Sequence, residues 1–163
     1  MVEWCALTGV GVVELATRLW SHDWSWRMQD VPELAAAFGW RILRSRPQWV
    51  MLDSGFGMAS GKVRGRDGLT EEVQLRVTDF VTEDAAGAAR LRDAFAGMAT
   101  ALTGAFGDPT VRIPGKPAEV RWAGAGTTLV LANLVVSVEL SLVTNSWLVS
   151  HDEMIEMERQ GLL

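Results

Sequence analysis

Three consecutive residues near the C-terminus are the first candidates for a chemical role. His151, Asp152 and Glu153 would suit metal binding or acid–base catalysis. Consecutive side chains on a helix point about 100° apart, so these three cannot converge on one ion. A helix beginning at Ser150, with Glu153 in the capping-box position, instead predicts a solvated, acidic helix start favoured by the helix dipole.

Two other candidates fail on spacing or on neighbours. Five residues stand between Gly55 and Gly61, where a phosphate-binding loop has four, and Val63 follows Lys62 where Ser or Thr is needed for magnesium. Cys5 has no basic cluster beside it to activate a thiolate. We therefore predict no catalytic residue, no metal, no cofactor and no enzymatic activity.

A polar segment with two tryptophans favours a binding role. Asp23, Trp24 and Trp26 combine a charge with large aromatic side chains, which is typical of protein-binding hot spots. The alternative is that both indoles cover the edge of a sheet. A partner-binding surface would also include acidic residues of the last helix, namely Asp152, Glu153 and Glu156.

Hydrophobic periodicity predicts the elements that must position these residues. Strands come in two runs of hairpins with helices before, between and after them, which predicts an α+β fold. We expect a largely antiparallel sheet, with a long central helix and the terminal helices packed on one face. Residues 111–118 read as a loop, and no internal repeat is visible. The expected helices are 10–20, 30–39, 83–106 and one from 150; the expected strands are 40–45, 48–53, 58–64, 72–80, 119–123, 127–132 and 134–143.

Length and composition limit the remaining choices. The chain has 163 residues, of which 48 % are hydrophobic, and we expect one domain over 1–163. The net charge of −5 disfavours nucleic acid, and no apolar run is long enough for a membrane span. A single cysteine and the absence of a basic, apolar leader predict a cytoplasmic location.

Two stretches carry a resemblance to known proteins. Residues 38–55, with Trp49 and Asp53, and the motifs at 66–68 and 76–79 look like a group of small actinobacterial proteins without assigned function. Small acidic α+β proteins of this kind are similar to immunity proteins that neutralise secreted toxins, an analogy of size, charge and organism type.

The sequence thus favours a cytoplasmic protein-binding module, an immunity protein or antitoxin that covers the active site of a secreted toxin. A basic toxin domain fits the acidic balance. The alternatives are a secretion chaperone and a small ligand-binding domain or enzyme with a pocket lined by Trp and Met. The partner and the oligomeric state stay open.

Overall fold

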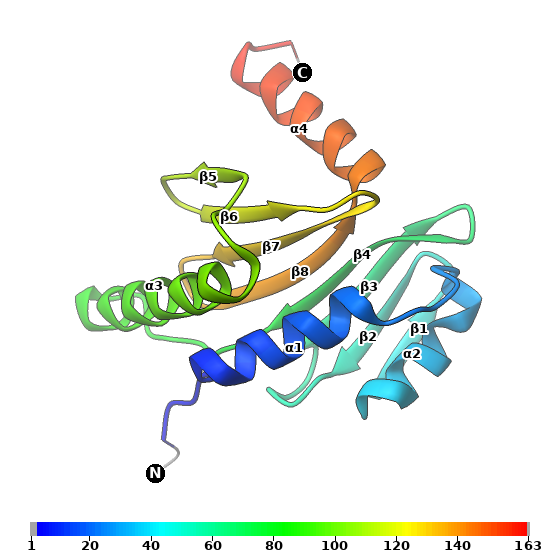
Figure 1. Ribbon diagram of the computed structural model, residues 1–163, viewed down its shortest axis with the longest axis horizontal. Helices are drawn as coiled ribbons and strands as arrows, with labels where there is room; N and C mark the ends of the chain where they lie inside the picture. The colour runs from blue at the N-terminus through cyan, green and yellow to red at the C-terminus, as the bar shows by residue number, and fades with distance from the viewer. Residues whose placement is uncertain (1–2, 163) are drawn as a thin grey trace.

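A single antiparallel sheet of eight strands runs through the part of the protein that the structure describes, residues 3–162 of a computed structural model. Four α-helices and one short 3-10 helix accompany it (Figure 1). The elements are α1 (Gly9–Ser21), η1 (Met28–Asp30), α2 (Val31–Phe38), β1 (Arg41–Arg46), β2 (Trp49–Asp53), β3 (Gly61–Arg66), β4 (Leu69–Arg76), α3 (Ala85–Phe106), β5 (Val111–Ile113), β6 (Ala118–Ala123), β7 (Thr127–Asn133), β8 (Val138–Thr144) and α4 (Asn145–Arg159).

The sheet consists of two four-stranded meanders joined at their last strands. Its order is β1-β2-β3-β4-β8-β7-β6-β5, so β4 pairs with β8 in the middle. Each meander follows a helical segment, which gives the two halves of the chain the same topology. The amino-acid sequences of the two halves show no matching repeat, so the sequence alone does not reveal this repeated topology.

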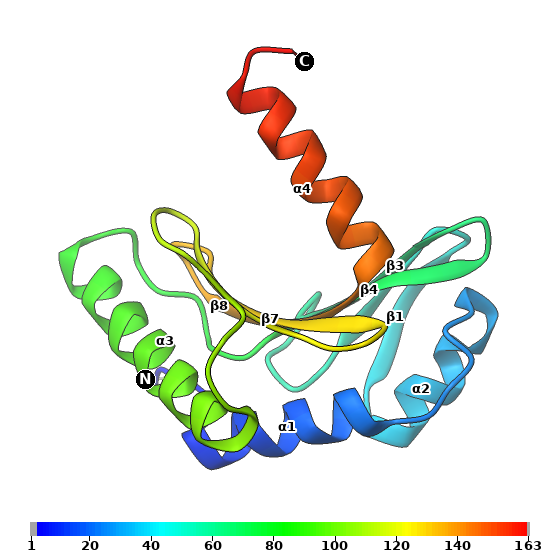
Figure 2. The same cartoon turned by 45° about the horizontal axis from the view of Figure 1, so that its top comes forward.

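Three helices cover one face of the sheet and form the core with it. α1 buries Val12, Ala16 and Leu19, and α3 buries Leu91, Met98 and Leu102. They pack on strand residues of alternate positions, such as Leu75 and Leu140. Figure 2 shows α1, α2 and α3 on this side and α4 rising from the other. We refer to the face opposite α1, α2 and α3 as the open face.

Side chains cap α1, α3 and α4 at their N-termini, whereas α2 has no side-chain cap. The backbone N–H of Gly87 donates to Asp84 Oδ1 at 2.7 Å at the start of α3, and that of Gly11 donates to Thr8 Oγ1 at 3.0 Å at the start of α1. α2 ends at Gly39, whose φ of 71° is the left-handed conformation that glycine adopts without strain.

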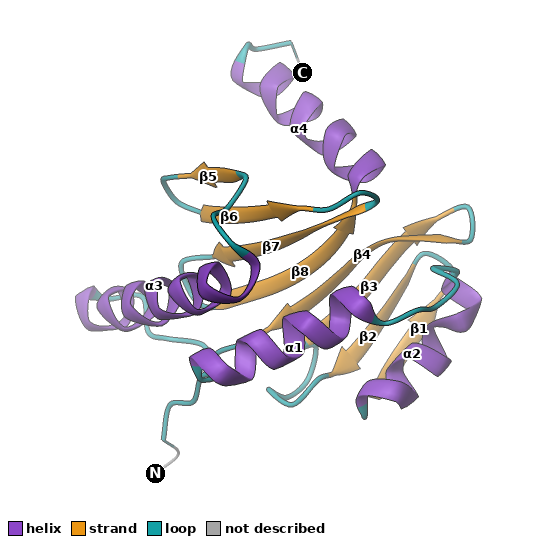
Figure 3. Ribbon diagram, in the orientation of Figure 1, coloured by secondary structure: helices purple, strands orange, loops and turns teal. Residues whose placement is uncertain are grey.

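The structure confirms the α+β class, the antiparallel sheet and the long central helix. It shifts the strands expected at 58–64, 72–80 and 134–143 to Gly61–Arg66, Leu69–Arg76 and Val138–Thr144, and it corrects three further details. The loop expected at 111–118 contains the short strand β5. The last helix begins at Asn145 with Thr144 as its N-cap, not at Ser150 (Figure 3). This helix also lies on the open face, whereas we expected all helices on one face. The capping-box pattern of Ser150 and Glu153 suggested the later start, whereas the hydroxyl of Thr144, the last residue of β8, accepts from the Trp147 backbone N–H.

The two tryptophans of the 22–27 segment pack against the protein's own core. Their ring centroids lie 5.2 Å apart, and both side chains are half-buried against the core cluster. The backbone carbonyl of Trp26 accepts a hydrogen bond from Thr70 N–H at 2.8 Å, which ties the segment to the β3–β4 hairpin. The observed packing agrees with the alternative in which the indoles cover the sheet.

Trp24→Ala and Trp26→Ala should therefore destabilise the fold. Full truncation of a buried tryptophan costs about 3–5 kcal/mol, so half-buried indoles should cost about 2 kcal/mol each. Urea unfolding followed by circular dichroism measures this loss. Val10→Ala, at a side chain that is 70 % exposed, is the control and should change the free energy of unfolding by less than about 0.5 kcal/mol.

Candidate binding surface

The helix α4 meets the open face only along its first two turns. Trp147 stacks on His151 with ring centroids 4.6 Å apart and an interplanar angle of 15°. Together with Leu148 they border a cavity of about 300 Å³ between the helix and the strands. Val143, the strand residue beneath them, is buried.

One buried arginine anchors α4 to the sheet. Arg121 of β6 is 7 % exposed and donates two parallel hydrogen bonds to Asp152, at 2.7 and 2.9 Å. Its Nε donates to Glu119 on the same strand. The hydrogen bonds that the guanidinium donates to Asp152 raise its pKa. A planar guanidinium holds a carboxylate in one orientation, so this pair sets the direction in which α4 leaves the sheet.

Beyond Asp152 the helix has no contact that buries any of its side chains. Met154 and Ile155 are 56 % and 42 % exposed, and no residue of α4 is fully buried. Met154 stands seven residues after Trp147, and Ile155 seven after Leu148, so they continue the side of the helix that packs at its base. The apolar side of α4 therefore extends beyond the part of the helix that contacts the sheet.

Two carboxyls lie in the floor of the cavity beneath α4. Glu72 of β4 and Glu139 of β8 point from the open face on the two central strands. Glu72 is 3 % exposed; Arg64 Nη2 lies 3.1 Å from its Oε1, and Gln74 donates to its Oε2 at 2.7 Å. Among the described residues, Glu139 has no ion-pair partner and accepts a bond from Ser141 Oγ at 3.3 Å.

Burial raises the pKa of both carboxyls. For Glu72, Arg64, Gln74 and His151 act in the opposite direction without cancelling the effect, and for Glu139, Ser141 and Arg64 do so. Proximity of the two carboxyls also raises the pKa of Glu72. The sequence showed these residues only as the wet side of two strands. The pairing of β4 with β8 places both on the open face, with Glu72 opposite Val143 and Glu139 opposite Arg76.

The structure separates the binding residues that the sequence suggested. Asp23 is exposed, but Trp24 and Trp26 beside it pack on the core side of the sheet. Asp152 is engaged by Arg121. Glu153 and Glu156 are exposed on α4, where Glu156 accepts a bond from Gln160 at 3.0 Å. The tryptophan segment and the acidic helix therefore lie on opposite faces and do not form one surface.

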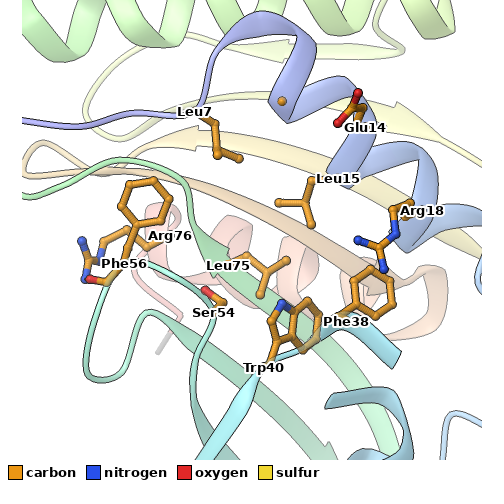
Figure 4. A pocket seen from close by; sticks show the side chains of 11 residues that line it. Leu7, Glu14, Leu15, Arg18, Phe38, Trp40, Ser54, Phe56, Leu75 and Arg76 are labelled. Atoms are coloured by element: carbon orange, nitrogen blue, oxygen red, sulfur yellow. The ribbon is translucent and has the colours of Figure 1, made fainter. Parts of the chain in front are cut away.

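A second cavity of about 300 Å³ lies between α1, α2 and the sheet (Figure 4). Trp40, Phe38 and Leu15 supply much of its apolar lining. Three charged residues line it, Glu14, Arg18 and Arg76. Both arginines are engaged: Arg18 lies over the Phe38 ring at 4.6 Å, and Arg76 donates to the Phe56 carbonyl at 2.6 Å.

Residues 3–162 contain no group of three His, Cys, Asp or Glu side chains arranged to hold a metal ion. Nor does any helix in that range combine the length and apolar character needed to cross a bilayer.

Removing the carboxylate that anchors α4 should loosen the helix alone. Asp152→Ala leaves Arg121 with only Glu119, and we expect amide hydrogen exchange in residues 146–159 to accelerate about tenfold. Exchange in β4 and β8 should stay unchanged. Glu153→Ala, the exposed neighbouring carboxylate, is the matched control, and equal acceleration in both variants would contradict an anchoring role for Arg121–Asp152.

Neutralising Glu139 should stabilise the protein at neutral pH. Its native pKa lies above the ordinary value of 4.5, so the native state binds more protons than the unfolded state and stability falls as pH rises through this interval. Glu139→Gln removes that loss: Tm should rise at pH 7, and the difference from wild type should vanish below pH 4.5. An unchanged or lower Tm at pH 7 would show that the native structure does not disfavour the Glu139 charge. The control is Glu153→Gln, at an exposed carboxylate.

Comparison with known proteins places the chain without naming an activity. Neither the curated proteins nor the solved structures gave a match. A family match covers residues 10–144, which include the whole sheet and α1, α2 and α3, and it ends at the residue before α4. The chain belongs to the family of unknown function DUF6301.

Proposed function

We propose that this protein is a non-enzymatic protein-binding module whose principal contact is the outer half of α4. The observation that carries the proposal is that Met154 and Ile155 continue the apolar side of α4 beyond the sheet, where both side chains are exposed. Exposed apolar side chains in a row on a helix are the usual anchors for a groove in a partner.

The physical chemistry of an isolated helix supports the same reading. α4 has 15 residues, a length at which a helix without tertiary contacts is marginal in water. Glu156 and Glu158 lie near its C-terminus, where the helix dipole disfavours negative charge, and only Arg159 compensates in the last turn. A partner that buries the apolar side would supply the stabilisation that the body of the protein does not.

The charge of α4 favours a specific class of partner. Glu153, Glu156 and Glu158 are exposed, so the helix would steer a basic protein surface towards it. Within this class we propose an immunity protein or antitoxin, acting in the cytoplasm, whose α4 enters and covers the active site of a basic toxin. Support comes from the acidic helix, the small α+β fold and the likeness in size and charge to such proteins.

The cavity of Figure 4 favours a second candidate, a small ligand-binding domain. Its aromatic and aliphatic lining with a few polar groups is typical of small-molecule sites. Soaking a purified sample with a small-molecule library and following Tm would test this candidate, because a ligand specific to the folded state raises Tm.

The principal proposal is tested with the product of a neighbouring gene. The expected neighbour is a gene for a large secreted protein with a variable C-terminal domain. That domain, the candidate toxin, would be co-expressed with this protein. Met154→Ala with Ile155→Ala keeps helix propensity and should weaken binding at least about 100-fold, since each buried apolar side chain contributes about 1.5–3 kcal/mol. Calorimetry measures the binding, and survival of the host measures neutralisation.

The control is Val10→Ala with Met58→Ala, two exposed apolar residues outside α4. It should leave binding and survival unchanged, and neither double variant should alter the free energy of unfolding by more than about 0.5 kcal/mol. Binding that promotes secretion of the neighbour without affecting survival would favour the secretion chaperone. A neighbourhood of metabolic genes would count against the toxin partner.

A further inference from the structure

The first three strands place a row of cations on the open face. In the register of β1, β2 and β3, Arg46 lies opposite Trp49, which lies opposite Arg64. One pleat along, Arg44 lies opposite Met51, which lies opposite Lys62. We refer to Arg41, Arg44, Arg46, Lys62, Arg64 and Arg66 as the basic face.

The basic face has almost no negative charge of its own. Asp53 is the only carboxylate in residues 41–66. The backbone N–H groups of Gly55 and Gly57 donate to it, and the first of these contributes most to lowering its pKa. Of the six cations, only Arg64 has an ion-pair partner among the described residues, namely Glu72. Asp53 lies opposite Arg41 in the register, and on the neighbouring strand Glu71 and Glu72 lie near Arg66 and Arg64. Six cations therefore stand against three carboxylates, which leaves this part of the sheet with a net positive charge.

Protection of a sheet edge does not account for this pattern. Charges on an edge strand prevent edge-to-edge association, which would explain the arginines of β1. Lys62 and Arg64 stand on β3, an interior strand with a neighbour on either side. The cations of β1 and β3 stand on either side of Trp49 and Met51 of β2, an arrangement that protection of the β1 edge does not require.

An aromatic side chain lies among the cations. Trp49 is half-buried, with Arg46 and Lys62 at 5.9 and 5.8 Å from its ring. The tryptophan also borders a shallow cavity of about 390 Å³ that reaches Trp147 at the base of α4. The basic face therefore continues into the surface that α4 forms with the sheet.

We propose that the basic face binds a short acidic segment of a protein partner, with carboxylates seated on its arginines. This rests on the proposed protein-binding function and adds the chemistry of a second contact. β1 spans about 17 Å, which matches about five residues of an extended chain. Arginines hold carboxylates bidentately, and Trp49 offers a flat apolar surface between them.

The charge around the patch favours a polypeptide over nucleic acid. The whole chain carries −5, and α4, with Glu153 and Glu156, rises from the same face of the sheet. A long polyanion would be repelled by these groups, whereas a segment of a few residues need meet only the basic face.

The experiment uses a fluorescein-labelled peptide of six glutamates flanked by Gly-Ser, with anisotropy as the readout at about 50 mM salt. Wild type should bind it. Arg44→Glu with Arg46→Glu should weaken binding at least about tenfold, since two opposing charges replace two carboxylate partners. Arg92→Glu with Arg112→Glu is the matched control: it makes the same change in net charge at exposed sites on α3 and β5, and should alter binding less than about twofold.

Three outcomes would overturn the proposal. They are absence of peptide binding to wild type, equal loss in the two double variants, and tighter binding of a six-phosphate oligothymidylate through the same arginines. The first two leave no specific site, and the third indicates nucleic acid. Met154→Ala with Ile155→Ala should bind the peptide normally, so failure of this test and failure of the α4 test are distinguishable.

Discussion

The pairing of β4 with β8 is the constraint on which the rest of the structure depends. It joins the two meanders, and its register decides which side chains meet. Leu75 opposite Leu140 builds the core beneath α1 and α3, while Gln74 opposite Ser141 faces the other way. A slip of one residue would turn one strand over relative to the other and bring Glu72 or Glu139 into the core. The same register therefore sets both the apolar layer and the polar floor beneath α4.

Local patterns in the sequence predict most of the elements but not the exact bounds of several of them. The alternation of Val73, Leu75 and Val77 with polar residues indicates a strand, because one side is buried and the other is wet. The boundary at Thr144 is less visible, since its β-branched neighbours suit a strand and its hydroxyl suits an N-cap. β5 is hidden by the prolines around it. Its three residues are all exposed, so no buried side reveals it.

The binding surface is less predictable than the fold, because it depends on contacts between distant segments and on how charge is distributed locally. Acidic residues on the last helix are visible in the sequence, but the role of Asp152 depends on Arg121, which arrives from a distant strand. The net charge of the whole chain conceals the six cations and single carboxylate of residues 41–66. Trp24 and Trp26 resemble a hot spot by composition, and only tertiary packing reveals that they cover the core.

The meeting of the two meanders in the middle of the sheet also bears on how the chain acquires its fold. During synthesis β4 emerges early, whereas its partner β8 follows only after α3 and three further strands. The first meander then presents a hydrogen-bonding edge bordered by Val73 and Leu75, the kind of edge on which nascent chains associate. Closing such a distant pair requires a large loop, so sheet closure is a late and slow event in folding.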